Sequence, residues 1–167
     1  MVKKKDEKKN AEAHFDLGNT HSSENRIDEA IGEYREALKL NPDFAEACNN
    51  LGLALFNKSL FDEASVEFKN ALRIYPDFAM AHSNLGLVFL NKGLWDDAIA
   101  EFRKAIKLNP EIAEAHYNLG IALNKKGLTK DAIKAYEGFI KYAPESYKNY
   151  VDGVKGVVAH MKKIKNQ

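Results

Sequence analysis

Residues 79–112 read AMAHSNLGLVFLNKGLWDDAIAEFRKAIKLNPEI, and this stretch decides the fold. Its landmarks are the pair Leu85 and Gly86, an alanine at Ala98, an aromatic residue at Phe102 and a proline at Pro110. The same landmarks return at one constant interval along the chain, at these positions: Leu17, Leu51, Leu119; Gly18, Gly52, Gly120; Ala30, Ala64, Ala132; Tyr34, Phe68, Tyr136; Pro42, Pro76, Pro144. A fixed period with shared landmarks predicts an array of repeats.

Each repeat is predicted to form two helices joined by a short turn. In the quoted repeat the helices span residues 79–92 and 94–108, with Gly93 between them. The equivalent positions of the other repeats are Asn25, Ser59 and Gly127. Pro110 ends the second helix, because proline disfavours helical backbone in the residue before it. No segment alternates with a period of two, so no sheet is expected.

The order Leu-Gly, alanine, aromatic residue and proline, returning with this period, resembles the tetratricopeptide repeat. This resemblance implies an all-α fold, a right-handed superhelical solenoid of four helix-turn-helix repeats with a C-terminal capping helix. It also implies that the first helices of the repeats line a concave groove. The sequence departs from the family pattern four residues before each glycine, where the usual large aromatic residue is replaced by His14, Cys48, His82 and His116.

The predicted organisation has three parts. Residues 1–10 form a basic segment that is expected to be disordered, and residues 147–164 form a capping helix with an apolar stripe that covers the last repeat. Between them lie the repeats 11–44, 45–78, 79–112 and 113–146.

Composition and motifs exclude several classes of function. The 167 residues carry a net charge of +1, so no general attraction to nucleic acid is expected, and membrane contact is at most peripheral. Without a long apolar run or a secretory signal, the predicted location is cytoplasmic. Phosphate-binding, nucleophile-elbow and HExxH motifs do not occur in the sequence, so we expect neither an enzyme nor a cofactor. No metal site is expected, because the histidines and Cys48 are interpreted as fillers of the interhelical core.

The helical period of 100° per residue defines the face of each first helix that points away from this core. This face carries a row of asparagines beside a row of apolar residues, namely Asn50, Asn84, Asn118, Leu53, Phe56, Leu87, Leu90 and Ile121. An asparagine amide both donates and accepts hydrogen bonds, which suits the main chain of an extended peptide, and an apolar stripe marks an interaction surface. Asparagine two residues before the glycine is also common in ordinary repeats of the family, so the apolar stripe carries more weight.

Charge on this face narrows the expected ligand. Glu12, Asp16, Glu46 and Glu114 point to the groove, against Lys125 alone. This balance disfavours the acidic tails that related chaperone-binding repeats hold, and it favours a neutral, apolar or mildly basic segment. The predicted function is a protein-interaction scaffold that binds an extended peptide of a protein partner. Two alternatives stay open, a self-assembling structural scaffold and a regulatory repeat module of a larger enzyme.

Overall fold

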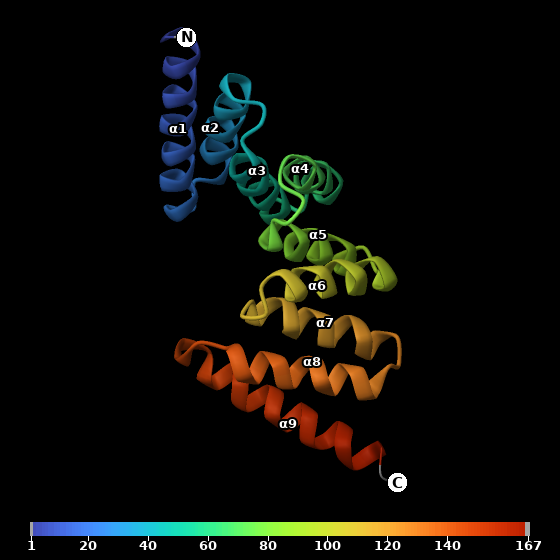
Figure 1. The fold of residues 1–167 in the computed structure, drawn as a ribbon. Helices are drawn as coiled ribbons and strands as arrows, with labels where there is room; N and C mark the ends of the chain where they lie inside the picture. Colours follow the sequence, from blue (N-terminus) through green and yellow to red (C-terminus); the bar gives the residue numbers. More distant parts are fainter. Residues whose placement is uncertain (1, 166–167) are drawn as a thin grey trace. The chain divides into compact units, whose positions relative to one another are not determined.

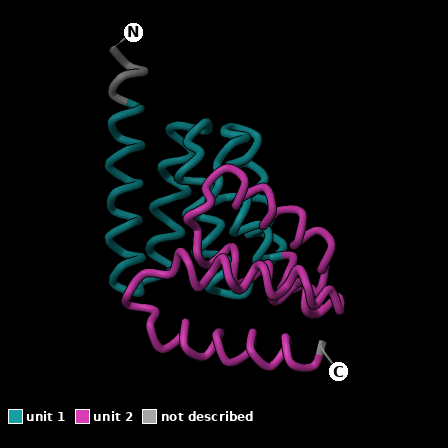
Figure 2. The backbone as a smooth tube through the Cα atoms, turned by 60° about the horizontal axis from the view of Figure 1, so that its bottom comes forward, with its two compact units in different colours: residues 1–88 teal, residues 89–167 magenta. Residues whose placement is uncertain are grey.

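The structure, a computed structural model, describes the backbone of residues 2–165 and the side chains of residues 7–164. All regular structure within this range is helical, and the chain divides into two compact units, residues 1–88 and 89–167 (Figure 2). The first unit contains α1 (Val2–Ser23), α2 (Ile27–Leu40), α3 (Ala45–Asn57), α4 (Phe61–Ile74) and most of α5 (Ala79–Asn91). The second contains α6 (Trp95–Leu108), α7 (Ala113–Lys125), α8 (Thr129–Tyr142), a short 3-10 helix (Glu145–Tyr147) and α9 (Lys148–Lys165).

In the first unit α1 packs on α2, α2 on α3 and α3 on α4, and in the second unit α6 packs on α7, α7 on α8 and α8 on α9 (Figure 1). The repeat landmarks make this packing close. Ala64 and Phe68 of α4 are fully buried, and the Phe68 ring lies so near Gly52 of α3 that a Cβ on Gly52 would stand 2.8 Å from its Cε1 atom. The glycine is therefore needed because a ring from the paired helix occupies the place of its side chain.

The turn within each repeat closes the first helix with a left-handed residue. Gly93 has φ +72° and donates its N–H to the Leu90 carbonyl, while Leu94 donates to the Phe89 carbonyl. This pair of bonds satisfies two carbonyls at the helix end and is the Schellman motif. The same pattern follows α1, α3 and α7, with Asn25, Ser59 and Gly127 in the left-handed position.

The first repeat differs from its predicted form in two ways. We expected residues 1–10 to be disordered, whereas α1 is helical from Val2 onward; Met1 lies outside the described residues. Lysine and glutamate favour helix, and neither glycine nor proline interrupts this segment. The repeat landmark Leu17 is 43% exposed, whereas its equivalents Leu51, Leu85 and Leu119 are buried.

Helix α9 packs on α8 and buries one line of its apolar residues, Val154, Val158 and Met161. The apolar stripe expected over residues 147–164 is wider than this buried line. Tyr150, Val157 and Ile164 are exposed, and their spacing of seven residues places them on a line of the helix beside the buried one. The C-terminal helix therefore keeps an apolar line outside the core.

Candidate functional site

In the first unit, the predicted asparagines belong to a hydrogen-bonded row across three first helices. Asn50 of α3 donates from Nδ2 to Asn19 Oδ1 of α1 at 2.8 Å. Asn84 of α5 donates from Nδ2 to Asn49 Oδ1 of α3 at 2.9 Å, and Asn49 donates to Asn50 Oδ1 at 3.2 Å. The sequence placed Asn50 and Asn84 on one face but did not predict that they bond to one another's helices. These side chains hold the first helices together as well as offering polar groups.

The amides of this row keep hydrogen-bonding capacity. Each asparagine NH₂ group has two hydrogens and each carbonyl oxygen has two lone pairs. The bond from Asn50 to Asn19 uses one of its hydrogens, and the bond from Asn84 to Asn49 likewise uses one. Both side chains are only half-buried. The second N–H of Asn84 can therefore point to a ligand, whereas the Asn50 side chain also hydrogen-bonds to Tyr34.

The predicted apolar residues of this unit are exposed to different degrees. Leu53 is 39% exposed, while Phe56 and Leu87 are half-buried. The Phe56 ring lies 5.2 Å from the ring of Phe61 on α4, so it also joins the two helices of its own repeat. Leu53 is therefore the predicted residue that offers the most free apolar surface in this unit.

In the second unit, the predicted residues Leu90, Asn118 and Ile121 are all half-buried. Asn118 lines a cleft of about 380 Å³, which we call the Glu114 cleft. Its other lining residues come from α7, α8, the 3-10 helix and α9, and they are Glu114, Tyr117, Phe139, Tyr147 and Tyr150. The Tyr147 hydroxyl donates to Glu114 Oε1 at 2.8 Å, and this hydrogen bond to the carboxylate raises the pKa of Tyr147.

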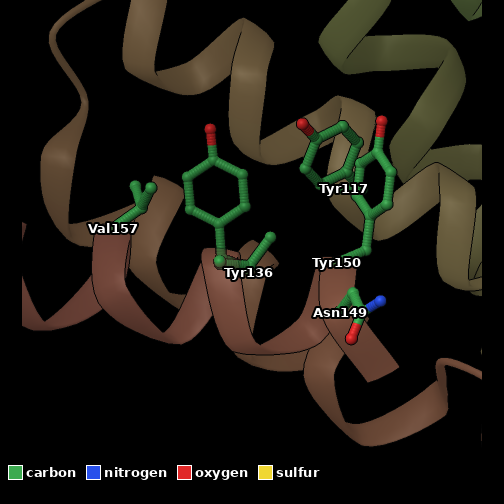
Figure 3. A pocket seen from close by; sticks show the side chains of 7 residues that line it. Tyr117, Tyr136, Asn149, Tyr150 and Val157 are labelled. Atoms are coloured by element: carbon green, nitrogen blue, oxygen red, sulfur yellow. The ribbon is translucent and has the colours of Figure 1, made fainter. Parts of the chain in front are cut away.

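A second cleft of about 430 Å³ lies between α9 and the pair α7 and α8 (Figure 3). We call it the valine cleft, and it is lined by Tyr117, Tyr136, Asn149, Tyr150, Gly153, Val154 and Val157. Tyr117 and Tyr150 line both clefts, with ring centroids 6.2 Å apart in an edge-to-face arrangement. Figure 3 shows these two rings beside one another, with Tyr136 projecting from α8 next to Val157.

The tyrosines of these clefts were missed as site residues. Tyr117 stands three residues before Gly120, where the other repeats have Phe15, Asn49 and Ser83. An aromatic residue where two other repeats have a small polar one could have indicated a special role for this position. Tyr147 and Tyr150 lie in the segment 147–164, which was predicted only as a capping helix. Their second role follows from the packing of α9, which leaves Tyr150 64% exposed.

The expectation that the histidines fill the interhelical core is right for one of them and only partly right for two others. His82 is buried and its Nε2 lies 2.9 Å from the Pro76 carbonyl oxygen, so it fills the core as expected. His14 and His116 are only half-buried. His14 Nδ1 lies 2.6 Å from Glu33 Oε2, and the His116 ring stacks on Tyr142 at 5.4 Å.

Gly138 explains how the His116 ring is accommodated. A Cβ at Gly138 would lie 2.2 Å from His116 Nδ1, so the missing side chain makes room for the ring. The same ring bonds through Nε2 to the Pro110 carbonyl oxygen at 2.9 Å, as His82 bonds to Pro76. These histidines therefore connect a first helix to the turn before it.

Cys48 is buried as predicted, against Ala71 and Ala81. Burial raises the pKa of its thiol to about 11, so the group stays protonated at neutral pH and packs as a small apolar side chain. No cluster of three or more metal-ligating side chains occurs among the described residues. Among the described helices, none is both long and apolar enough to cross a membrane.

Comparisons with known proteins agree with the repeat architecture. A family model described as tetratricopeptide repeat matches residues 61–107 and 83–147, and a model described as TPR repeat matches residues 18–59. A search of curated proteins gives no match.

Solved structures show the same fold. A crystal structure of MamA is 28% identical with a TM-score of 0.74, and the match covers 83% of this chain and 81% of that chain. A second MamA crystal structure is 26% identical with a TM-score of 0.74, covering 92% and 87%. The first TPR of Spaghetti (RPAP3), bound to the HSP90 peptide SRMEEVD, is 20% identical with a TM-score of 0.70, covering 72% and 95%, and this likeness shows the fold alone.

These matches confirm the predicted all-α helical solenoid. Tetratricopeptide repeats are generally non-catalytic modules through which proteins interact, and the coarse prediction of an interaction scaffold agrees with this. The family models cover more than half of the residues, and the landmarks recur at one constant interval, so this chain belongs to the tetratricopeptide repeat family.

Proposed function

We propose that this protein is a scaffold that binds an extended, neutral to apolar segment of a partner protein along the exposed faces of its first helices. In the first unit the residues proposed to make such a contact are Asn50, Asn84, Leu53, Phe56 and Leu87. In the second unit, taken by itself, they are Leu90, Asn118 and Ile121. The function needs no catalytic group or cofactor, and a cytoplasmic location stays a prediction.

The observation that carries the proposal is the asparagine row beside exposed Leu53. An extended peptide has an N–H and a C=O at every residue, and these groups lose water when the peptide binds. Amides anchored by the bonds from Asn50 to Asn19 and from Asn84 to Asn49 are already oriented, so little side-chain entropy is lost when they bond to a ligand. Leu53 supplies adjacent apolar area for a partner side chain.

The charge of the first unit supports a segment that is not acidic. Glu12 and Asp16 on α1 and Glu46 on α3 are all exposed. An acidic peptide would meet like charges there, which opposes association. A neutral or mildly basic segment avoids that repulsion.

The test selects binders from a displayed library of random peptides of about ten residues and then titrates the best binder against two matched variants. Leu53→Asp places a charge at the proposed contact. Val66→Asp makes a similar change at a residue of α4 that is 55% exposed and lies outside the proposed face. Loss of a buried leucine contact of about 1.5 kcal/mol or more predicts at least a tenfold weaker affinity for Leu53→Asp. Val66→Asp should bind normally, and equal affinities for both variants would refute the proposed surface.

A second candidate, self-assembly, is favoured by Leu17. Its 43% exposure leaves an apolar side chain on the open end of the first repeat, in a cleft that also includes Leu40. If copies stack through this end, the mass measured by light scattering should rise with protein concentration. Leu17→Asp should then abolish the rise, whereas a constant monomer mass would eliminate this candidate.

A further inference from the structure

The Glu114 cleft combines a carboxylate with several aromatic rings in the second unit. Phe139, which is 2% exposed, forms its buried part, with the Tyr117 ring 5.3 Å away. The Tyr147 and Tyr150 rings complete the lining, with centroids 6.5 Å apart. Both the π faces of aromatic rings and the carboxylate attract positive charge.

We propose that the Glu114 cleft binds an arginine side chain of the partner segment, and that the valine cleft binds a bulky apolar residue next to that arginine. This inference rests on the proposed function, because it assumes that the ligand is a peptide, and it adds the residues that the peptide must contain. The two clefts share Tyr117 and Tyr150, so neighbouring side chains of one segment can reach both.

The chemistry of the Glu114 cleft favours guanidinium. Glu114 is exposed, and Tyr147 donates one hydrogen bond to Oε1. A carboxylate accepts about four hydrogen bonds, so capacity remains on both oxygens for the N–H groups of an arginine. The Asn118 side chain, whose oxygen can accept a further bond, lines the same cleft. Guanidinium is planar, weakly hydrated and stacks on aromatic faces, which a lysine ammonium does less well.

The valine cleft is chemically different. Val154 and Val157 contribute aliphatic surface, and Gly153 contributes open space, because a Cβ there would meet no atom within 4 Å. The Asn149 amide and the Tyr136 hydroxyl are the polar groups of its lining side chains apart from the two shared tyrosines. A volume of about 430 Å³ is large enough for a leucine or phenylalanine side chain.

The experiment uses the full chain with isotope-labelled tyrosine and follows the aromatic NMR signals during titration with small capped dipeptides. The probe is acetyl-arginyl-leucine methylamide. Its first control is acetyl-citrullyl-leucine methylamide, which has the same shape as the probe without the charge. Its second control, acetyl-arginyl-alanine methylamide, keeps the charge and removes the bulky side chain. We expect the probe to shift the signals of Tyr117, Tyr147 and Tyr150, and to bind about fivefold to tenfold more tightly than the citrulline control.

Matched variants test the assignment to Glu114. Glu114→Gln should weaken the probe to the affinity of the citrulline control. Glu111→Gln makes the same charge change at an exposed residue of the preceding loop that does not line the cleft, and it should bind the probe normally. Tyr150→Ala should weaken the probe and both controls, because this ring lines both clefts.

Equal affinity of the arginine and citrulline probes, or an equal effect of Glu114→Gln and Glu111→Gln, would overturn the inference. So would tyrosine signals that shift on dilution of the protein alone, since the clefts would then be filled by a second copy of this chain. Equal affinity of the leucine and alanine probes would refute the assigned role of the valine cleft. These outcomes are separate from the library experiment with Leu53→Asp, which can fail while the arginine probe still binds, or succeed while arginine shows no advantage.

Discussion

The substitution Gly156→Ala should stabilise the protein, whereas Gly52→Ala should leave its stability unchanged or lower it, although both replace a helical glycine by alanine. Each gains about 1 kcal/mol of helix propensity. At Gly156 no atom lies within 4 Å of the added Cβ, so the gain is expressed in full. At Gly52 the Cβ stands 2.8 Å from Phe68 Cε1 and 2.9 Å from Cδ1. The Phe68 side chain is fully buried.

Overpacking a well-packed core costs about 1–3 kcal/mol, which cancels or exceeds the propensity gain at Gly52. The two variants should therefore differ by about 1–3 kcal/mol in the free energy of unfolding, with Gly156→Ala the more stable. Urea denaturation followed by far-ultraviolet circular dichroism measures this difference, with the wild-type chain as reference. If Gly52→Ala is stabilised as much as Gly156→Ala, the ring of Phe68 does not constrain this position and our account of the repeated glycine is wrong.

Three further predictions concern the turn, the cap and the cysteine. Ser59 has φ +61°, so Ser59→Gly should raise the free energy of unfolding by up to about 1 kcal/mol, and Gly127→Ser should lower it by a similar amount. Urea denaturation measures both changes, and a lower urea midpoint for Ser59→Gly would contradict the strain argument. A chain that ends at Ser146 loses the burial of Val154, Val158 and Met161, about 4.5–9 kcal/mol in total, so it should melt earlier and aggregate. An unchanged melting temperature with a monodisperse sample would refute the capping role. Because burial raises the pKa of Cys48 to about 11, roughly one thiol in a thousand is ionised at about pH 8. The native protein should therefore react with a chromogenic disulfide reagent far more slowly than the urea-unfolded chain, and similar rates would show that the thiol is accessible.

Helix order and turn positions could be predicted from the sequence because they depend on local chemistry repeated four times. The landmark set around Gly86 and Pro110 recurs with one period, and this recurrence separates a structural requirement from chance. The left-handed turn positions were equally visible, because glycine and asparagine hold three of the four. Residues 2–10 were misjudged because a run of charged residues is compatible with a disordered segment and with a solvent-exposed helix. In the structure, α1 includes these residues.

The surface chemistry was only partly predictable. Asn50 and Asn84 were assigned to one face from helix periodicity, but their bonds to Asn19 and Asn49 join residues more than 30 positions apart in the chain. Such bonds depend on the spacing between neighbouring first helices, which helix periodicity does not report. Leu17 shows the same limit, since its landmark position is identical to that of Leu51, yet Leu17 is 43% exposed and Leu51 is buried.

The sequence by itself determined the all-α class, the helix pairs and the face of each helix that carries the core, because each follows from contacts within one repeat and is written four times. Only the tertiary structure decided what α9 does at the end of the second unit. Its apolar residues form two lines, and the packing angle on α8 selects Val154 and Val158 for burial while Tyr150 stays outside. That choice brings Tyr147 to Glu114, 33 residues away in the chain, and creates the two tyrosine-lined clefts. The residues that form these clefts do not recur from repeat to repeat, so the sequence pattern did not indicate them and only the packed helices reveal them.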